Sequence, residues 1–162
     1  MAEHIIDQSF SIRQSKEDIF DFFASAENLE RLTPPWLNFK IISSLPINMD
    51  VGTVIEYKIK LHGIPIRWQS EITVWDPPHR FCDVQRKGPY RKWVHEHYFE
   101  PSDRGTLVRD RVTYEVMGGT LINQLFVKKD LAKIFNYRQA TLLTIFNDEC
   151  KKSSALDPKW GV

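Results

Sequence analysis

The residues best suited to acid–base or metal chemistry in this sequence are His95, His97 and Asp110. One residue separates the two histidines, so in an extended strand both side chains point to the same face. Glu96 and Glu100 favour solvent for the opposite face, so we expect both histidines to point inward. Imidazoles close to a carboxylate can move protons, orient a ligand or bind a metal ion.

Asp110 is predicted to face the same interior from the next strand. It shares its strand face with Val112 and Tyr114, whereas Arg109 and Arg111 occupy the other face. A buried carboxylate is costly unless it is paired or hydrogen-bonded, so we expect Asp110 to contact one or both histidines. The carboxylate raises the pKa of an imidazole and burial lowers it, so the sign of the net shift is left open.

Three more polar residues are candidates for this interior. If Phe81 faces inward, Asp83 and Gln85 on the same strand do so as well. Arg138 follows Phe135 by three residues, on the otherwise apolar stripe of a long helix. The three side chains would extend the polar cluster of histidines and acid.

Several roles are open to such a cluster. It can be an internal network that only fixes strand register, or the polar part of a ligand pocket. His95 or His97 paired with Asp110 can transfer protons, and the three together can hold one metal ion, although their spacing matches no metal-site signature. We therefore predict neither a metal nor a cofactor. The predicted ligand-binding residues are Tyr57, Ile59, Trp68, Ile72, Asp83, Gln85, Trp93, His95, His97, Phe99, Asp110, Tyr114 and Arg138.

The elements that position these residues begin with a strand and two short helices. Residues 3–12 alternate as a strand, and Ser15 is a candidate N-cap for a helix with apolar residues at helical spacing. A second helical turn ends at Thr33-Pro34-Pro35, because proline removes backbone donors and disfavours helix in the residue before it. For Trp36 we favour a role in anchoring the irregular crossover to the core, with a lid over the cavity mouth as the alternative.

A meander of antiparallel strands and a long helix make up the rest. Period-two alternation runs from Asn38 onward to Val116, with a two-residue hairpin turn at His62-Gly63. Residues 121–151 are predicted to be helical. The apolar side of this helix comprises Leu121, Leu125, Leu131, Phe135, Leu142 and Phe146. The sequence thus predicts an α+β fold with a curved antiparallel sheet of about seven strands around a long C-terminal helix.

Size and charge exclude several classes of protein. The 162 residues are expected to form one domain over 3–152 and a flexible tail over 153–162. A net charge of +1 argues against nucleic acid as a partner, and no apolar run is long enough to span a membrane. The two cysteines, Cys82 and Cys150, are far apart and no apolar signal region begins the chain, so we expect a reduced, cytoplasmic protein. We expect a monomer or a weak homodimer.

Five short motifs carry a resemblance to a known superfamily. They are Leu32-Thr33-Pro34-Pro35-Trp36-Leu37, Phe81-Cys82-Asp83-Val84-Gln85, Gly88-Pro89-Tyr90, Trp93-Val94-His95-Glu96-His97 and Asp110-Arg111-Val112-Thr113-Tyr114. Over residues 3–150 the chain resembles the SRPBCC superfamily of START domains and birch-pollen-type allergens, in particular its small bacterial ligand-binding branch. The resemblance implies the helix-grip fold. Some members are labelled nucleotide-sugar epimerases, but this chain lacks a Gly-x-Gly-x-x-Gly motif and a tandem βαβ pattern.

Three functions follow as hypotheses. The first is binding of a small amphipathic, aromatic or lipid-like molecule in a cavity between the sheet and the C-terminal helix. The alternative is an enzyme of the polyketide cyclase, dehydratase or hydrolase type that uses the His–Asp pair in the same cavity. The third is a protein-interaction module, although the strand pattern predicts no apolar patch on the outside.

Overall fold

The structure, a computed structural model, describes the backbone of residues 2–155 and the side chains of residues 2–147. In this part of the chain seven antiparallel strands form one sheet, in the order β1-β7-β6-β5-β4-β3-β2. The strands are β1 (His4–Ile12), β2 (Lys40–Ile41), β3 (Val54–Leu61), β4 (Ile64–Asp76), β5 (Arg80–Lys87), β6 (Tyr90–Ser102) and β7 (Gly105–Val116). The helices are α1 (Lys16–Ala24), α2 (Asn28–Leu32), α3 (Gly119–Ile122) and α4 (Lys128–Ala155). The predicted α+β helix-grip fold is confirmed.

Local sequence explains the two short helices. The Ser15 hydroxyl accepts a hydrogen bond from the Asp18 amide at 3.2 Å and so caps α1, as predicted. Helix α2 ends at Leu32, two residues before the proline pair, and a single 3-10 turn, Pro35–Leu37, follows. Trp36 in this turn is 54% exposed and lies edge-on against Tyr137, so the prediction that it anchors the crossover in the core is wrong.

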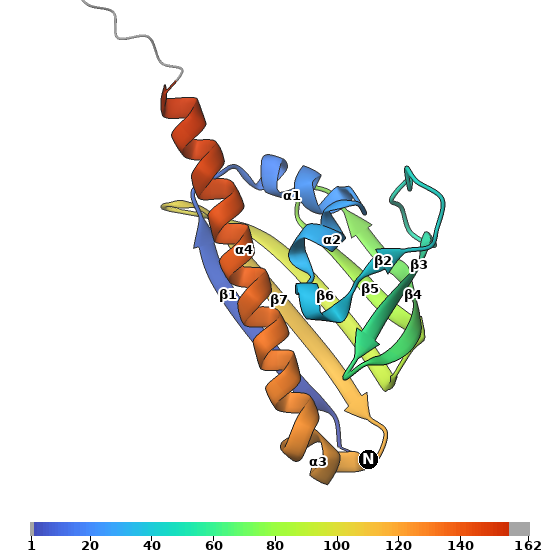
Figure 1. Cartoon of the computed structure of the whole chain (residues 1–162). Coiled ribbons are helices and arrows are strands. Elements are labelled where there is room, and N and C mark those ends of the chain that lie inside the picture. The colour runs from blue at the N-terminus through green and yellow to red at the C-terminus, as the bar shows by residue number, and fades with distance from the viewer. Residues whose placement is uncertain (1, 156–162) are drawn as a thin grey trace, which may run out of the picture.

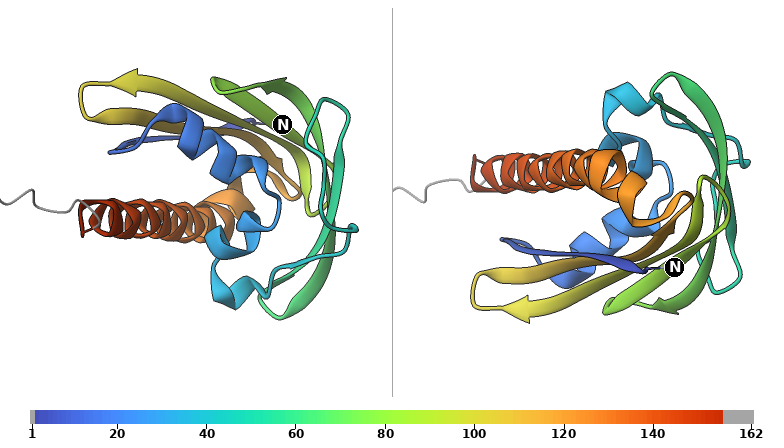
Figure 2. Two further views of the ribbon diagram at one scale, coloured as in Figure 1. Left: turned by 90° about the horizontal axis from the view of Figure 1, so that it is seen from above. Right: turned by 90° about the horizontal axis from the view of Figure 1, so that it is seen from below.

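The sheet curves, and the helices lie on its concave side. Helix α4 runs diagonally across the sheet in front of β7 and β1 (Figure 1), and the views from above and below show the sheet bending around it (Figure 2). Helices α1 and α2 close one side of the space between sheet and α4. The strands β3–β7 are joined by hairpins, so a continuous meander forms the curved wall.

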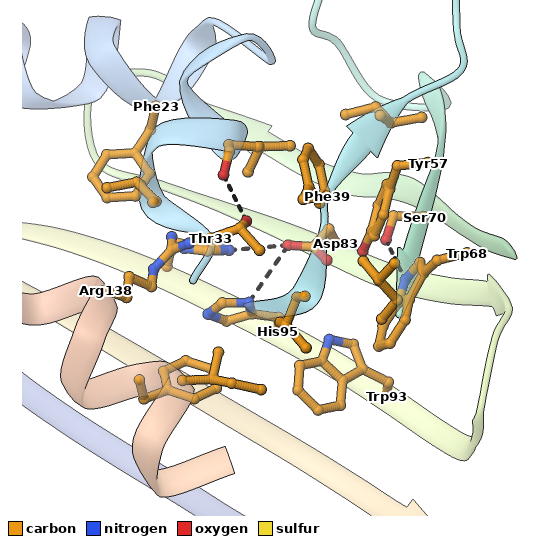
Figure 3. Close-up of a pocket in the computed structure, with 18 of the residues that line it drawn as sticks. Phe23, Thr33, Phe39, Tyr57, Trp68, Ser70, Asp83, Trp93, His95 and Arg138 are labelled. Carbon is orange, nitrogen blue, oxygen red and sulfur yellow. Dashed lines mark hydrogen bonds and ion pairs between the residues drawn. The ribbon is translucent and has the colours of Figure 1, made fainter. Parts of the chain in front are cut away.

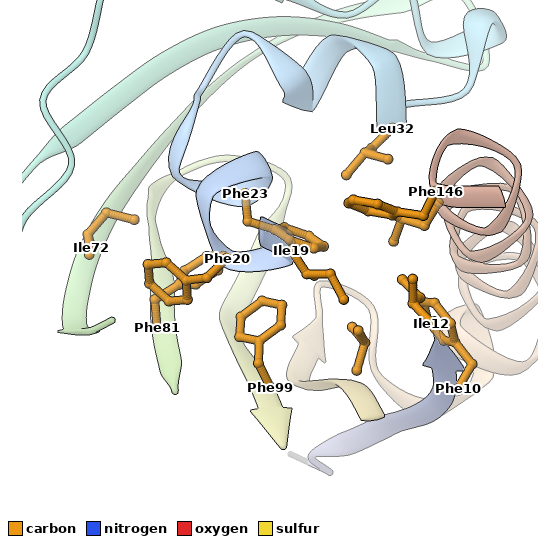
Figure 4. Packing of buried hydrophobic residues seen from close by; sticks show 12 residues of the cluster. Phe10, Ile12, Ile19, Phe20, Phe23, Leu32, Ile72, Phe81, Phe99 and Phe146 are labelled. Atoms are coloured by element: carbon orange, nitrogen blue, oxygen red, sulfur yellow. The ribbon is translucent and has the colours of Figure 1, made fainter. Parts of the chain in front are cut away.

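One end of this space is filled by an apolar core. Phe20, Phe23, Phe81 and Phe99 pack with Phe146 of α4, and each is at most 6% exposed (Figure 4). The rings of Phe20 and Phe99 meet edge to face at 5.5 Å between centroids, an arrangement that aromatic pairs prefer. This end of the fold is therefore solid, and any cavity must lie farther along the sheet.

The start of the long helix differs from the prediction. Leu121 and Leu125, expected on the buried side, are 66% and 51% exposed. A π-helical segment, Asn123–Val127, joins α3 to α4, and its extra residue per turn rotates the preceding residues away from the face set by Leu131. Asn123 is buried instead, and its side-chain oxygen accepts a hydrogen bond from the Tyr114 hydroxyl at 3.0 Å.

Large apolar side chains are exposed around the same segment. Five lie between residues 117 and 126, and they are Met117, Leu121, Ile122, Leu125 and Phe126. These residues belong to the helical junction, to which the strand pattern and its prediction of no apolar patch do not extend.

The end of the chain bears on two other predictions. Helix α4 continues through Ala155 and so includes the first three residues of the predicted tail, whereas residues 156–162 lie outside the described residues. Cys82 is buried, and the side chain of Cys150 lies outside the described part. Among the described helices, none combines the length and the apolar character needed to cross a bilayer.

Candidate functional site

A cavity of about 170 Å³ lies between the sheet and α4, next to the solid core (Figure 3). Its wall is formed mainly by aromatic and aliphatic side chains, and the ionisable groups of Asp83, His95, His97 and Arg138 lie together in it. Nine predicted site residues line it: Tyr57, Ile59, Trp68, Ile72, Asp83, Trp93, His95, His97 and Arg138. Strand alternation therefore predicts correctly that the eight of them on the sheet face the interior, and Arg138 reaches the cavity from α4.

Four predicted residues do not line the cavity. Gln85 donates to the Tyr90 carbonyl at 2.8 Å and accepts from the Tyr90 amide, so it ties the β5–β6 hairpin together. Phe99 belongs to the solid core, Tyr114 bonds to the start of the long helix, and Asp110 lies beneath the histidines. Alternation identifies the face of a strand but not how far along it the cavity extends, so it also predicts residues that lie beyond the cavity.

The cavity also has a wall that the strand pattern could not reveal. Helix α2 and the crossover after it close the side away from the meander (Figure 3). The residues they contribute are Leu29, Leu32, Thr33, Leu37, Phe39 and Met49. Ser70 is a second omission, although it shares its strand face with Trp68 and Ile72 and could have been included on that ground.

Three neighbouring strands bring two acids and two histidines together. Asp83 of β5 pairs in register with His95 of β6, and His97 of β6 pairs with Asp110 of β7. His95 Nε2 lies 3.0 Å from Asp110 Oδ1, and His97 Nε2 lies 3.0 Å from Asp83 Oδ2. His97 Nδ1 also faces Asp110 Oδ1 at 3.0 Å, in a contact too bent for a good hydrogen bond. Each histidine therefore lies between both carboxylates.

Arg138 adds a positive charge from the helix side. Its Nε lies 3.4 Å from Asp110 Oδ2, and its guanidinium carbon lies 5.2 Å above the Phe23 ring. Figure 3 shows the side chain reaching from α4 toward Asp83. Two of its buried nitrogens, Nε and Nη2, have no hydrogen-bond partner among the described residues. Arg138 thus lines the cavity with a guanidinium group whose Nε faces Asp110 and whose Nη2 has no hydrogen-bond partner among the described residues.

The surroundings shift the pKa values of the cluster in different directions. Burial lowers the pKa of His95, the neighbouring His97 lowers it further, and the two carboxylates offset this only in part. Burial alone would also lower the pKa of His97, but the carboxylates of Asp110 and Asp83 outweigh it and raise that pKa. Near pH 6.5 these opposite shifts favour a neutral His95 beside a protonated His97.

Both acids remain ionised in this arrangement. Burial alone would raise the pKa of Asp110, but Arg138 and the two histidines hold it well below its ordinary value. Asp83 follows the same pattern, with its pKa lowered chiefly by His97 and His95 against the effect of burial. Two carboxylates then balance the guanidinium and the His97 cation, so the buried cluster is neutral as a whole.

Aromatic neighbours fix the two imidazole rings. His97 stacks on Phe81 with 3.9 Å between centroids and 12° between planes. His95 lies 3.7 Å from the His97 ring and meets Trp93 and Phe135 edge to face. The rings are held on both sides, so the direction of each ring nitrogen is set by packing.

The opposite end of the cavity carries hydroxyl groups. Trp68 Nε1 donates to the Ser70 hydroxyl at 3.0 Å, and the Tyr57 ring stacks on Trp68 at 5.8 Å. Burial and the nearby Asp83 carboxylate raise the pKa of Tyr57 well above its ordinary value, so its phenol keeps its proton. This end can meet a ligand with neutral polar groups.

We expect the two histidines of the metal-free protein to titrate separately. His95 should lose its proton below the ordinary pKa of 6.5 and His97 above it. Histidine ring shifts followed by NMR between about pH 5 and pH 9, in buffer with a chelator, measure both pKa values.

The same shifts set the pH dependence of stability. A raised pKa means that the contribution of His97 is fully present below pH 6.5 and is lost as the pH rises through its folded pKa. A lowered pKa means that the contribution of His95 is present above pH 6.5 and is lost as the pH falls through its folded pKa. Two ring signals that move together around pH 6.5 would contradict this charge assignment.

Comparisons with known proteins point to one family and one fold. Residues 12–136 match the family described as polyketide cyclase/dehydrase and lipid transport. Protein CV1439 from Chromobacterium violaceum is 11% identical, with a TM-score of 0.71 over 88% of this chain and 96% of that one. Major latex-like protein 151 from Panax ginseng is also 11% identical, with a TM-score of 0.67 over 89% and 97% of the two chains.

A third similar structure has a name that implies an activity. The nucleoside-diphosphate sugar epimerase from Corynebacterium glutamicum is 22% identical to this chain, with a TM-score of 0.67. The match covers 92% of this chain but 30% of the epimerase. Identities this low show a shared fold alone. No curated protein matches the chain.

Proposed function

The chain belongs to the polyketide cyclase/dehydrase and lipid transport family, and from this premise we propose that it binds a ring-sized molecule with an acidic or carbonyl group. One observation carries the proposal. A largely apolar cavity is lined by Arg138, whose Nε faces Asp110 at 3.4 Å and whose buried Nη2 has no hydrogen-bond partner among the described residues. Such a cavity combines an apolar surface for affinity with a few polar groups for orientation.

The volume of the cavity limits the ligand. Pockets for drug-sized molecules measure about 300–1,000 Å³, whereas an apolar cavity of about 150 Å³ holds one benzene molecule. The cavity of about 170 Å³ therefore fits a single ring with a small substituent. Within the range of amphipathic, aromatic and lipid-like ligands, this volume favours compact aromatic molecules over long acyl chains.

The polar groups define the orientation of such a ligand. A buried donor without a partner costs about 1–3 kcal/mol, so a ligand oxygen placed next to Arg138 would relieve that cost. The ring would then lie toward Trp68 and Tyr57, where aromatic side chains form the wall. A carboxylate or a carbonyl oxygen meets these conditions, whereas an amine would face a guanidinium group.

A second candidate function is an enzyme that moves protons on a bound carbonyl compound. One contact favours it: His95 Nε2 lies 3.0 Å from Asp110 Oδ1, and its other ring nitrogen is turned toward Asp83 at the cavity wall. This is the arrangement of a base held by a buried carboxylate. Turnover of a bound carbonyl compound that disappears in His95→Ala supports the enzyme, and binding without turnover leaves a carrier or sensor.

We expect benzoate to raise the melting temperature in a concentration-dependent manner, and dodecanoate to have little effect. Ligand that binds only the folded state raises the free energy of unfolding by RT ln(1 + [L]/Kd), so a thermal-shift series gives the affinity. Calorimetry with benzoate and dodecanoate measures the two affinities directly. Retention of dodecanoate in place of benzoate would contradict the size limit.

A pair of variants locates the binding site. Ile59→Phe fills the cavity, since Ile59 lines it and is 6% exposed, and should abolish the effect of benzoate. Ile64→Phe is the matched control, because Ile64 is 65% exposed on the adjacent strand. Equal benzoate binding by both variants would place the ligand elsewhere.

Size-exclusion chromatography tests the expected monomer or weak homodimer, and fractionation of the producing cells tests the expected cytoplasmic location.

A further inference from the structure

We propose that Asp83, His95 and His97 form a three-ligand site for a divalent transition-metal cation, with an open coordination position toward the cavity. The inference goes beyond ligand binding and does not depend on it. Within the described residues this is the one group of at least three histidine, cysteine or acidic side chains whose ligand atoms all lie within 4.8 Å of each other. Two of the three residues are buried, and all three line the cavity.

The distances suit a small metal ion. Ligand atoms about 2.1 Å from one ion and separated by angles of 90–110° lie about 3.0–3.4 Å from each other. His97 Nε2 is 3.0 Å from Asp83 Oδ2, and His95 Nδ1 is 3.8 Å from the same oxygen. Small side-chain movements therefore suffice to place one ion between these three atoms.

The far side of each imidazole is already oriented for this role. Metal-binding histidines almost always direct their second ring nitrogen to a carboxylate, a carbonyl or water. Here Asp110 Oδ1 is hydrogen-bonded to His95 Nε2 at 3.0 Å, and His97 Nδ1 faces the same oxygen at 3.0 Å in a bent contact, so one buried carboxylate lies behind both rings. Arg138 holds the other oxygen of that carboxylate at 3.4 Å.

Packing limits the freedom of the ligands before any ion binds. The His97 ring lies flat against Phe81, and the His95 ring is held edge-on by Trp93 and Phe135. Asp83 is the most accessible of the set, with 19% of its side-chain surface exposed against 4% for His97. It is therefore the ligand with most room to move toward the ion.

Ligand type and charge indicate the class of ion. Two imidazoles and one carboxylate suit zinc and ferrous iron, and three protein ligands leave a position for water or substrate. With both histidines neutral, a divalent cation and Arg138 carry three positive charges, and Asp83 and Asp110 carry two negative charges. The site then has one net positive charge. An anionic oxygen on the open position would neutralise it, so a bound ion would favour the same acidic molecules.

The test uses the full chain, treated with a chelator and then titrated with Zn²⁺ by calorimetry, and with Co²⁺ by visible absorption. We expect one ion per chain. Asp83→Asn and His95→Ala should each weaken Zn²⁺ binding at least about tenfold, because each removes a direct ligand. The cobalt spectrum should show fewer than six ligands in the parent protein and should weaken in both variants.

A surface pair provides the control. His62 Nε2 and Asp130 Oδ2 lie 2.6 Å apart, and His62 is 71% exposed. His62→Ala should bind Zn²⁺ as the parent protein does. Absence of stoichiometric binding by the parent protein overturns the proposal, as does binding that Asp83→Asn leaves intact. Should His95→Ala fail to fold, Asp83→Asn and the cobalt spectrum decide. Benzoate binding in the presence of chelator tests the proposed function separately.

Discussion

Asp110→Asn is expected to lower the free energy of unfolding by about 3–5 kcal/mol, which for a chain of this size corresponds to a fall in melting temperature of about 6–20 °C. Asp110 is 1% exposed and contacts His95, His97 and Arg138. The amide keeps the shape of the side chain but removes the charge. It therefore leaves the Arg138 cation buried without its counter-ion, which is the costly way to break a buried pair.

Urea denaturation of the parent protein and the variant measures this loss. Asp7→Asn is the matched control, because Asp7 of β1 forms a two-contact ion pair with Arg109 at the surface of β7, the strand that carries Asp110. We expect little change from it, since solvent screens exposed pairs. Equal and small losses in the two variants would show that the buried cluster contributes no more than a surface ion pair.

Arg138→Met should lower the affinity for benzoate by about 10- to 150-fold, because a hydrogen bond to a charged group contributes about 1.5–3 kcal/mol. Methionine retains part of the aliphatic packing over Phe23 and removes the unpartnered donors. The affinity for toluene, which has the ring without the carboxylate, should change much less. The ratio of the two affinities is the quantity to compare, because it is insensitive to a general loss of stability.

Arg67→Met controls for the loss of a positive charge. Arg67 is 71% exposed and its nearest acid, Glu56, is 3.9 Å away, so benzoate binding should be unchanged. A parallel fall of benzoate and toluene affinity in Arg138→Met would mean that the arginine supports the cavity wall and does not select the ligand. Isothermal calorimetry at one ionic strength measures the affinities for benzoate and for toluene.

Much of the site could be predicted because strands impose a strict alternation. His95, His97 and Asp110 face the interior as their positions require, and their contacts follow from the pairing of β6 with β5 and β7. Alternation does not show which part of a strand packs into the core and which part lines the cavity. Phe99 and Tyr114 are accordingly buried beside the cavity rather than in its wall.

Other features depend on contacts that no local pattern encodes. The π-helical segment after α3 shifts the helical phase, so Leu121 and Leu125 are exposed although their spacing matches the apolar stripe. Trp36 is exposed because the proline pair turns it outward, against Tyr137 of α4. The volume of the cavity likewise depends on how α2 and the crossover pack against the sheet, and no local sequence pattern shows that packing.

The most direct measurement is a crystal structure of the full chain with 4-bromobenzoate, whose bromine is located by anomalous scattering. The expected result is one bromine among the aromatic rings of Tyr57, Trp68 and Trp93, with the carboxylate next to Arg138 Nη2. A bromine found on the outer surface alone, beside an interior filled by side chains, would contradict a binding cavity beneath α4.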